Sequence, residues 1–127
     1  MDAITIDQPF ADLICSGIID VINMNFPKFA SGKLLIHSSG KIDKKSKPTP
    51  QQIMAIGDRK FDFKTNAIIG EVTVLKSVEN HQSIWAKQGM HHWIVTEAII
   101  YKNPIRNVKG RGGLWDFDYQ EHLKSNK

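Results

Sequence analysis

The sequence predicts a single domain of the α+β class, a small β-barrel flanked by two or three helices. Short runs of strand-forming residues are separated by two segments that carry helix start and stop signals. The chain has 127 residues and is 41% hydrophobic, which is enough for one core, and it contains no internal repeat. We therefore treat residues 1–127 as one domain, in which residues 118–127 form a short helical or disordered tail.

Two segments have the residue pattern of a helix. Pro9 stands where the first helical residue is expected, apolar residues follow at helical spacing, and Gly17 ends the segment. The second segment begins with a capping-box pattern, in which Thr49 caps the helix and Gln52 reaches back to it. We expect this second helix to end near Gly57.

Strands are predicted from runs of β-branched and other apolar residues. The longest run, residues 67–78, is expected to pair with residues 90–101. Pro27 and the small residues 30–32 predict a loop between the second and third strands. The predicted strands are residues 3–6, 20–26, 33–37, 67–78, 90–101 and 114–117.

Composition limits the classes of function. A formal net charge of +4 and a pI near 9.2 favour a polyanionic partner. The single cysteine, Cys15, excludes an internal disulfide and fits a reducing compartment. The N-terminus lacks the basic segment of a signal peptide, and no apolar run approaches the ~18 residues that a membrane span needs. We therefore expect a cytoplasmic protein without a membrane partner.

A series of short motifs follows in order along the chain. The first two of them lie in the stretch from Ile4 to Ser39, which joins a strand, a Pro-started helix and two further strands. The motifs are Gln8-Pro9-Phe10-Ala11, Leu34 to Ser39, Ala67 to Val72, Trp85-Ala86, His92 to Val95, Pro104-Ile105, Lys109-Gly110 and Gly113-Leu114-Trp115. Together they resemble the ASCH domain, named from the activating signal cointegrator homology region, over nearly the whole chain to about Phe117.

The resemblance implies a PUA-like mixed β-barrel with a cleft beside the first helix that binds RNA or a nucleoside. Some members cleave RNA or hydrolyse the acyl group of an N4-acylated cytidine. They use a lysine and a threonine or glutamate early on the second strand, often followed by an arginine. An ungapped placement puts these positions at Ile19, Ile22 and Met24, so the usual charged set is absent here. Asn23 matches an asparagine that is often seen in the family.

The resemblance therefore favours an RNA- or nucleoside-binding module. The alternative is an RNA-processing hydrolase, a ribonuclease or an N4-acylcytidine amidohydrolase, that uses substituted residues. Replacing a buried charged pair with apolar groups can be neutral or stabilising, whereas losing one partner costs ~3–5 kcal/mol. Ile22, Met24 and Phe26 would share one face of a strand. Two interpretations of that apolar stripe remain open, a ligand cleft and a packed core.

Candidate ligand-binding residues are of three kinds: groups expected in the cleft, one aromatic residue for stacking, and cations for phosphate. Trp85 lies in a polar stretch and is the stacking candidate, whereas Trp93 is expected to be structural. The lysines of residues 41–47 either track a phosphate backbone or form a solvated loop. The full set is Gln8, Phe10, Asn23, His37, Ser39, Lys41, Trp85, Lys109 and Arg111.

For the hydrolase alternative, the sequence offers three acid–base groups, His37, Glu71 and Lys109. The five histidines have no metal-ligand spacing, so we expect neither a metal nor another cofactor. Cys15 lies in the first helix among apolar neighbours. It is therefore expected to be a buried, inert thiol rather than a nucleophile.

Overall fold

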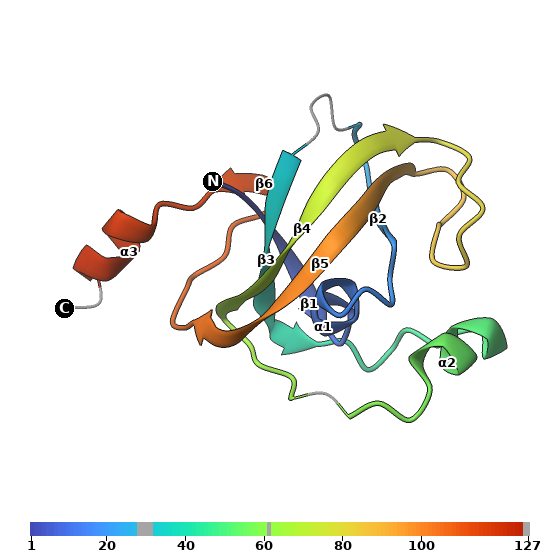
Figure 1. Ribbon diagram of the computed structural model, residues 1–127, viewed down its shortest axis with the longest axis horizontal. Helices are drawn as coiled ribbons and strands as arrows, with labels where there is room; N and C mark the ends of the chain where they lie inside the picture. Colours follow the sequence, from blue (N-terminus) through green and yellow to red (C-terminus); the bar gives the residue numbers. More distant parts are fainter. Residues whose placement is uncertain (28–31, 61, 126–127) are drawn as a thin grey trace.

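Six strands form one mixed sheet in the order β2-β5-β4-β3-β1-β6, and three helices lie around it (Figure 1). The computed structural model describes residues 1–27, 32–60 and 62–125. The α+β class predicted from the sequence is confirmed. The elements are β1 (Asp2–Gln8), α1 (Phe10–Cys15), β2 (Val21–Met24), β3 (Gly32–Ile42), α2 (Pro50–Ile56), β4 (Ala67–Val78), β5 (His91–Ile105), β6 (Leu114–Asp116) and α3 (Tyr119–Ser125).

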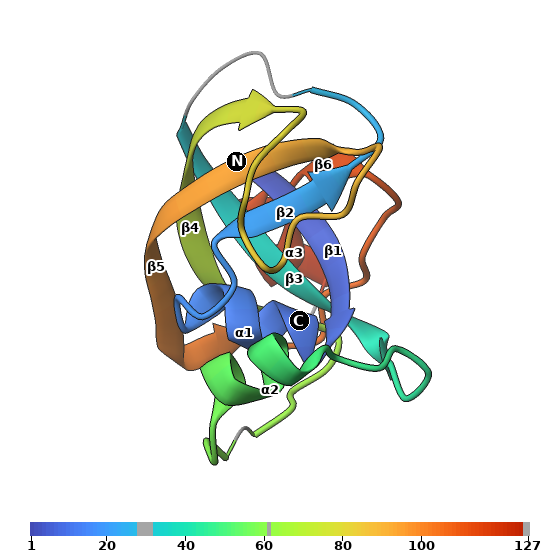
Figure 2. The same ribbon diagram turned by 90° about the vertical axis from the view of Figure 1, so that its right-hand side faces the viewer.

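The sheet is open. β1 and β3 pair in parallel, with Ala3 opposite Leu35, whereas every other neighbouring pair is antiparallel. Figure 2 shows the strands curving over α1 at one end of the sheet. The edge strands β2 and β6 do not pair with each other in the described ranges, so the closed barrel expected from the sequence is not found.

Helix α1 packs closely against the middle of the sheet. The helix begins at Phe10, one residue after the predicted start at Pro9, and Gly17, with a φ of 82°, follows its end as predicted. Residues 11–15 are all buried. A Cβ atom on Gly70 of β4 would lie 2.7 Å from the Cys15 sulfur, so glycine permits this close approach. Burial raises the pKa of the Cys15 thiol, which agrees with an inert side chain.

The main core lies between α1 and the sheet and includes Ile19 and Ile22. Ile19 and Ile22 are each 5% exposed, and Ile22 stands opposite Trp93 in the β2–β5 pair. Met24 is partly buried against the same cluster, while Phe26 is 38% exposed with its ring edge-on to Trp93. Of the two interpretations of this stripe, the packed core is the one observed.

Local signals predicted several elements well. The capping box is present at α2, where the Gln52 N–H donates to Thr49 Oγ1 at 3.1 Å and the Thr49 N–H donates to Gln52 Oε1 at 2.9 Å. The predicted bounds of β4 and its pairing with β5 are confirmed. β3 runs to Ile42, beyond its predicted end, because pairing with β1 continues as far as Gln8. Residues 28–31 of the predicted loop lie outside the described residues.

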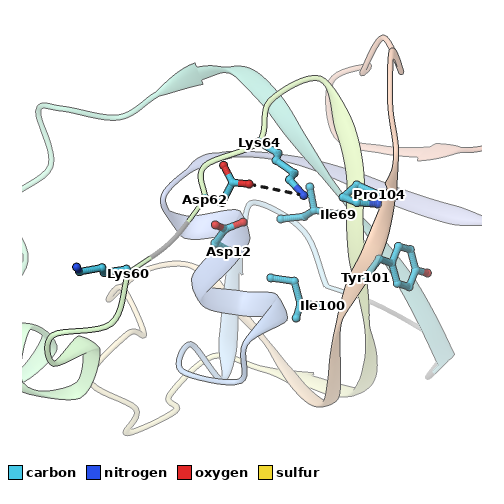
Figure 3. A pocket seen from close by; sticks show the side chains of 8 residues that line it. All are labelled: Asp12, Lys60, Asp62, Lys64, Ile69, Ile100, Tyr101 and Pro104. Atoms are coloured by element: carbon cyan, nitrogen blue, oxygen red, sulfur yellow. Dashed lines mark ion pairs between the residues drawn. The ribbon is translucent and has the colours of Figure 1, made fainter.

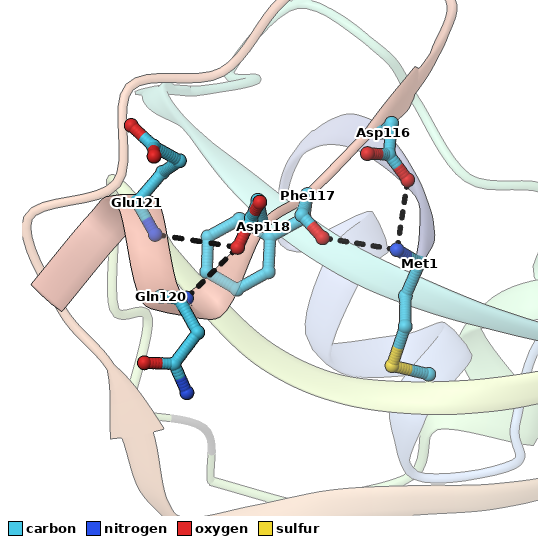
Figure 4. Close-up of polar contacts among 6 residues, drawn as sticks. All are labelled: Met1, Asp116, Phe117, Asp118, Gln120 and Glu121. Carbon is cyan, nitrogen blue, oxygen red and sulfur yellow. Dashed lines mark hydrogen bonds and ion pairs between the residues drawn. The ribbon is translucent and has the colours of Figure 1, made fainter.

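The first residue of the chain is joined to the end of β6 and to the residue after it (Figure 4). The Met1 ammonium group donates to Asp116 Oδ1 at 2.8 Å and to the Phe117 carbonyl at 2.9 Å. Asp118 then caps α3, since its Oδ1 accepts from the backbone N–H of Gln120 at 2.9 Å and of Glu121 at 3.2 Å. The tail is therefore helical through residue 125, and residues 126–127 lie outside the described ranges.

Candidate functional site

The end of β3, the start of β4 and the segment after β5 meet at one end of the sheet. The N–H of Asn66 donates to the Ser39 carbonyl at 3.4 Å, and the N–H of Val108 donates to the Asn66 carbonyl at 2.9 Å. These two bonds bring together stretches of chain that are far apart in the sequence. Exposed cations lie on these stretches of chain and on the last residues of β5. We call Lys41, Lys102, Arg106, Lys109 and Arg111 the basic end.

His37 anchors the segment that carries two of these cations. Its ring is 1% exposed, and its Nε2 lies 2.6 Å from the Val108 carbonyl, which can only accept a hydrogen bond. Nε2 therefore carries the proton, and Nδ1 accepts from the Thr5 hydroxyl at 3.2 Å. The Trp115 indole N–H in turn donates to Thr5 Oγ1 at 3.1 Å. Both ring nitrogens of His37 are thus engaged within the fold, and burial lowers the pKa of the ring.

Gly110 closes over this histidine. A Cβ atom there would lie 2.5 Å from His37 Cε1 and 2.6 Å from Thr5 Oγ1, closer than real Cβ contacts. The neighbouring side chains Lys109 and Arg111 are exposed. The glycine therefore allows the backbone to lie on the imidazole ring while the flanking cations face solvent.

The three acid–base candidates of the hydrolase alternative are not assembled into one site. Glu71 on β4 accepts from the Tyr101 hydroxyl at 2.8 Å and pairs with Lys33 Nζ at 3.1 Å. The hydrogen bond from Tyr101, with a contribution from Lys33, lowers the pKa of this carboxyl group. Within the described part of the chain, no hydrogen bond or ion pair joins Glu71, His37 and Lys109 to one another.

Asn23 and Trp85 also have structural roles. The Asn23 amide donates to the Trp85 carbonyl at 2.9 Å and accepts from the Lys87 N–H at 2.8 Å, which ties the loop before β5 to β2. Trp85 is 9% exposed and belongs to the main core. The structure places this indole in the interior and not on the exposed surface that stacking on a base requires.

The remaining predicted residues lie around the start of α1 and the end of β3. Gln8 is fully buried, and its amide N–H groups donate to Asp12 Oδ1 at 2.9 Å and to the Lys64 carbonyl at 2.8 Å. Phe10 packs partly buried against the core. The Ser39 hydroxyl donates to Asp7 Oδ1 at 2.5 Å at the edge of the basic end. Gln8 and Phe10 thus support the helix that forms the wall of a nearby cavity.

That cavity, of about 140 Å³, lies beside α1 (Figure 3). Asp12 contributes a carboxyl group from α1, and Lys64 lies 3.7 Å from Asp62 in an ion pair on the opposite side. Asp12 is 3% exposed, so desolvation raises the pKa of its carboxyl group against the opposing effect of the Gln8 hydrogen bond. The residues that line the cavity are Asp12, Lys60, Asp62, Lys64, Ile69, Ile100, Tyr101 and Pro104.

The sequence interpretation missed Asp12 and Lys64. The spacing of Asp12, four residues after Gln8, is the one local signal, because residues at i and i+4 meet across a helical turn. Lys64 lies in a stretch without secondary structure, and it reaches the cavity because its carbonyl accepts from Gln8. This cavity could be found only from the folded chain.

Two comparisons with known proteins were negative. A scan of the chain against models of protein families finds no match, and a search of characterised proteins likewise finds none.

Among the described residues, no three or more His, Cys, Asp or Glu side chains are grouped so as to hold a metal ion. None of the helices in those ranges has the length and apolar character needed to cross a membrane.

Proposed function

We propose that this protein is a binding module for single-stranded RNA, which it holds across the basic end. The proposal is supported by the hydrogen bonds among Ser39, Asn66 and Val108, which bring together the segments that carry the exposed Lys41, Lys109 and Arg111. Cations on adjacent loops bind phosphates with release of counterions. No Asp or Glu occurs from residue 102 to residue 115, so the segment after β5 presents positive charge alone.

The adjacent cavity favours a single strand over a duplex. Its volume of about 140 Å³ is smaller than the ~300–1,000 Å³ of sites for drug-sized ligands, and suits one planar group. The bases of a duplex are stacked and paired, whereas those of a single strand can be splayed out into such a cavity. A nucleoside or one base of a strand is therefore the partner that fits both features.

We propose that the fold is that of a PUA-like ASCH domain, an incomplete barrel in this chain. The order of strand, helix, strand and strand at the N-terminus, with β1 parallel to β3, supports this assignment. The curvature of the sheet over α1 also agrees with it. A crystal structure in which the edges at β2 and β6 approach each other would support the proposal, and one with a flat, widely open sheet would contradict it.

The function is tested by titrating labelled single-stranded RNA by fluorescence anisotropy between ~50 and ~200 mM salt. We expect log K to fall linearly with log salt, and Lys109→Ala to reduce the slope by ~0.7 because one phosphate contact is lost. Adding Arg111→Ala should weaken binding further. Lys76→Ala is the matched control. It removes the same charge from an exposed position near the C-terminal end of β4, whereas the basic end lies beside the N-terminal end of this strand.

Two results would overturn the proposal. One is the absence of binding at the lowest salt concentration. The other is equal loss of affinity in Lys109→Ala and Lys76→Ala, because binding would then follow net charge and not the basic end.

A further inference from the structure

The cavity beside α1 presents a fixed carboxyl group. Gln8 holds Asp12 twice, since its amide donates to Asp12 Oδ1 at 2.9 Å and its Oε1 accepts from the Asp12 N–H at 3.0 Å. Figure 3 shows the carboxyl group of Asp12 directed into the space between Asp62, Lys64 and Ile100. The acceptor is therefore oriented before any ligand arrives.

The other walls complete a mixed site. Lys64 supplies an ammonium group that pairs with Asp62 at 3.7 Å and also favours the charged form of Asp12, and it is partly exposed. Ile69, Ile100 and Pro104 supply apolar surface. A suitable ligand is therefore a small, planar group with N–H donors beside an acceptor. A phosphate is disfavoured in this cavity because the carboxyl groups of Asp12 and Asp62 would repel it.

Among the nucleobases, guanine has this arrangement on its Watson–Crick edge. Its N1–H and its 2-amino group are adjacent donors that a carboxylate accepts together, and O6 beside them accepts from an ammonium group. Adenine and uracil do not offer two adjacent donors. We propose that the cavity beside α1 binds a guanine base, with Asp12 accepting from N1 and the 2-amino group and Lys64 donating to O6.

The position of the cavity agrees with this assignment, which rests on the proposed binding of RNA. Lys64 is two residues before Asn66, whose backbone joins Ser39 and Val108 at the basic end. A strand held there by its phosphates can place one base beside α1. Burial also raises the pKa of the Asp12 carboxyl group, so its charged form is poorly solvated until a donor pair reaches it.

The test compares short single-stranded RNAs that differ at one position, which is guanine, inosine or adenine. We expect guanine to bind roughly 5- to 100-fold more tightly than adenine, as for a bidentate base contact. Inosine, which lacks the 2-amino group, should fall between them. Guanosine monophosphate is titrated separately to distinguish a free nucleotide from a base within a strand. Weaker binding of the nucleotide than of the guanine-containing strand supports a base within a strand as the ligand. Tighter binding of the nucleotide overturns that assignment.

Two variants test the named contacts. Asp12→Asn retains an oxygen that accepts from Gln8, so we expect the fold and the salt slope to be kept while the preference for guanine over adenine is lost. Lys64→Gln should reduce the same preference by removing the charged donor to O6. Asp58→Asn, an exposed position outside the cavity lining, is the control and should leave the preference unchanged.

The failures can be told apart. Binding without a preference for guanine, or a preference that survives both Asp12→Asn and Lys64→Gln, overturns the base assignment and leaves RNA binding in place. Absence of binding to every strand overturns the proposed function and the base assignment with it.

Discussion

Substitution of Gly110 by alanine should destabilise the fold through a collision with His37. The new Cβ would lie 2.5 Å from His37 Cε1 and 2.6 Å from Nδ1. Carbon atoms prefer separations of ~3.5–4.0 Å, so the overlap is about 1 Å. Either the segment or the ring must move, and ring movement breaks the bond between Nε2 and the Val108 carbonyl.

The expected size of the effect follows from three contributions. Overpacking costs ~1–3 kcal/mol. Loss of one hydrogen bond adds ~1 kcal/mol. Gly110 does not have a left-handed backbone conformation, so alanine can adopt its φ. The lower entropy of the unfolded alanine variant then offsets ~0.4–1 kcal/mol of the destabilisation. We therefore expect a net loss of about 2 kcal/mol in the free energy of unfolding.

Gly112 provides a control in the same segment. A Cβ atom there would have no neighbour within 4 Å, and its φ is not left-handed, so Gly112→Ala should be neutral or stabilising. Urea unfolding followed by tryptophan fluorescence measures both variants. Equal stability of Gly110→Ala and the unsubstituted protein, or equal destabilisation by both substitutions, would refute the packing of Gly110 on His37.

Two further predictions concern burial. Burial lowers the pKa of His37 in the folded protein. Below the ordinary histidine pKa of ~6.5, the unfolded chain therefore binds more protons than the folded one. The free energy of unfolding should consequently fall as the pH falls. His37→Gln should reduce this dependence in urea titrations between pH ~7 and ~5, and an unchanged dependence would contradict the assignment. Ile22→Ala should lower the free energy of unfolding by ~2–5 kcal/mol, because it leaves a cavity in the core. Phe26→Ala, at a half-exposed position of the same stripe, should cost clearly less, and the reverse order would place the core elsewhere.

The sequence predicted those elements whose signals are local. The capping box at Thr49 satisfies backbone groups within four residues, and it needs no other part of the chain. The apolar run of β4 is long enough to define its own bounds. The ends of β3 and β5 are missed because residues 38–42 and 102–105 interrupt the apolar runs with polar residues, glycine or proline, and pairing with β1 and β4 holds them in extended form. That pairing is tertiary, and no local pattern encodes it.

The same distinction explains the candidate site. Trp85 lies among polar neighbours, which predicted exposure, yet Asn23 holds its loop against β2 and buries the ring. His37 was considered a ligand contact, and its role depends on Val108, seventy-one positions later in the chain. The positive charge of Lys109 and Arg111 was recognised because charge is visible in the sequence. That their segment lies beside the one carrying Lys41 follows only from the backbone bonds that Asn66 makes in the folded chain.

The burial of Ile19 and Ile22 also disfavours a charged site at these two positions. Both side chains belong to the main core, so a lysine or glutamate at either position would be a buried charge without a partner. Such a charge costs several kcal/mol, and introducing a single charged residue at either position would therefore destabilise the domain without creating a site. At Asp12 the hydrogen bond from Gln8 offsets part of this cost, and the cavity lies beside the carboxyl group. In this chain, a ligand that needs a carboxyl group is therefore best accommodated between α1 and Lys64.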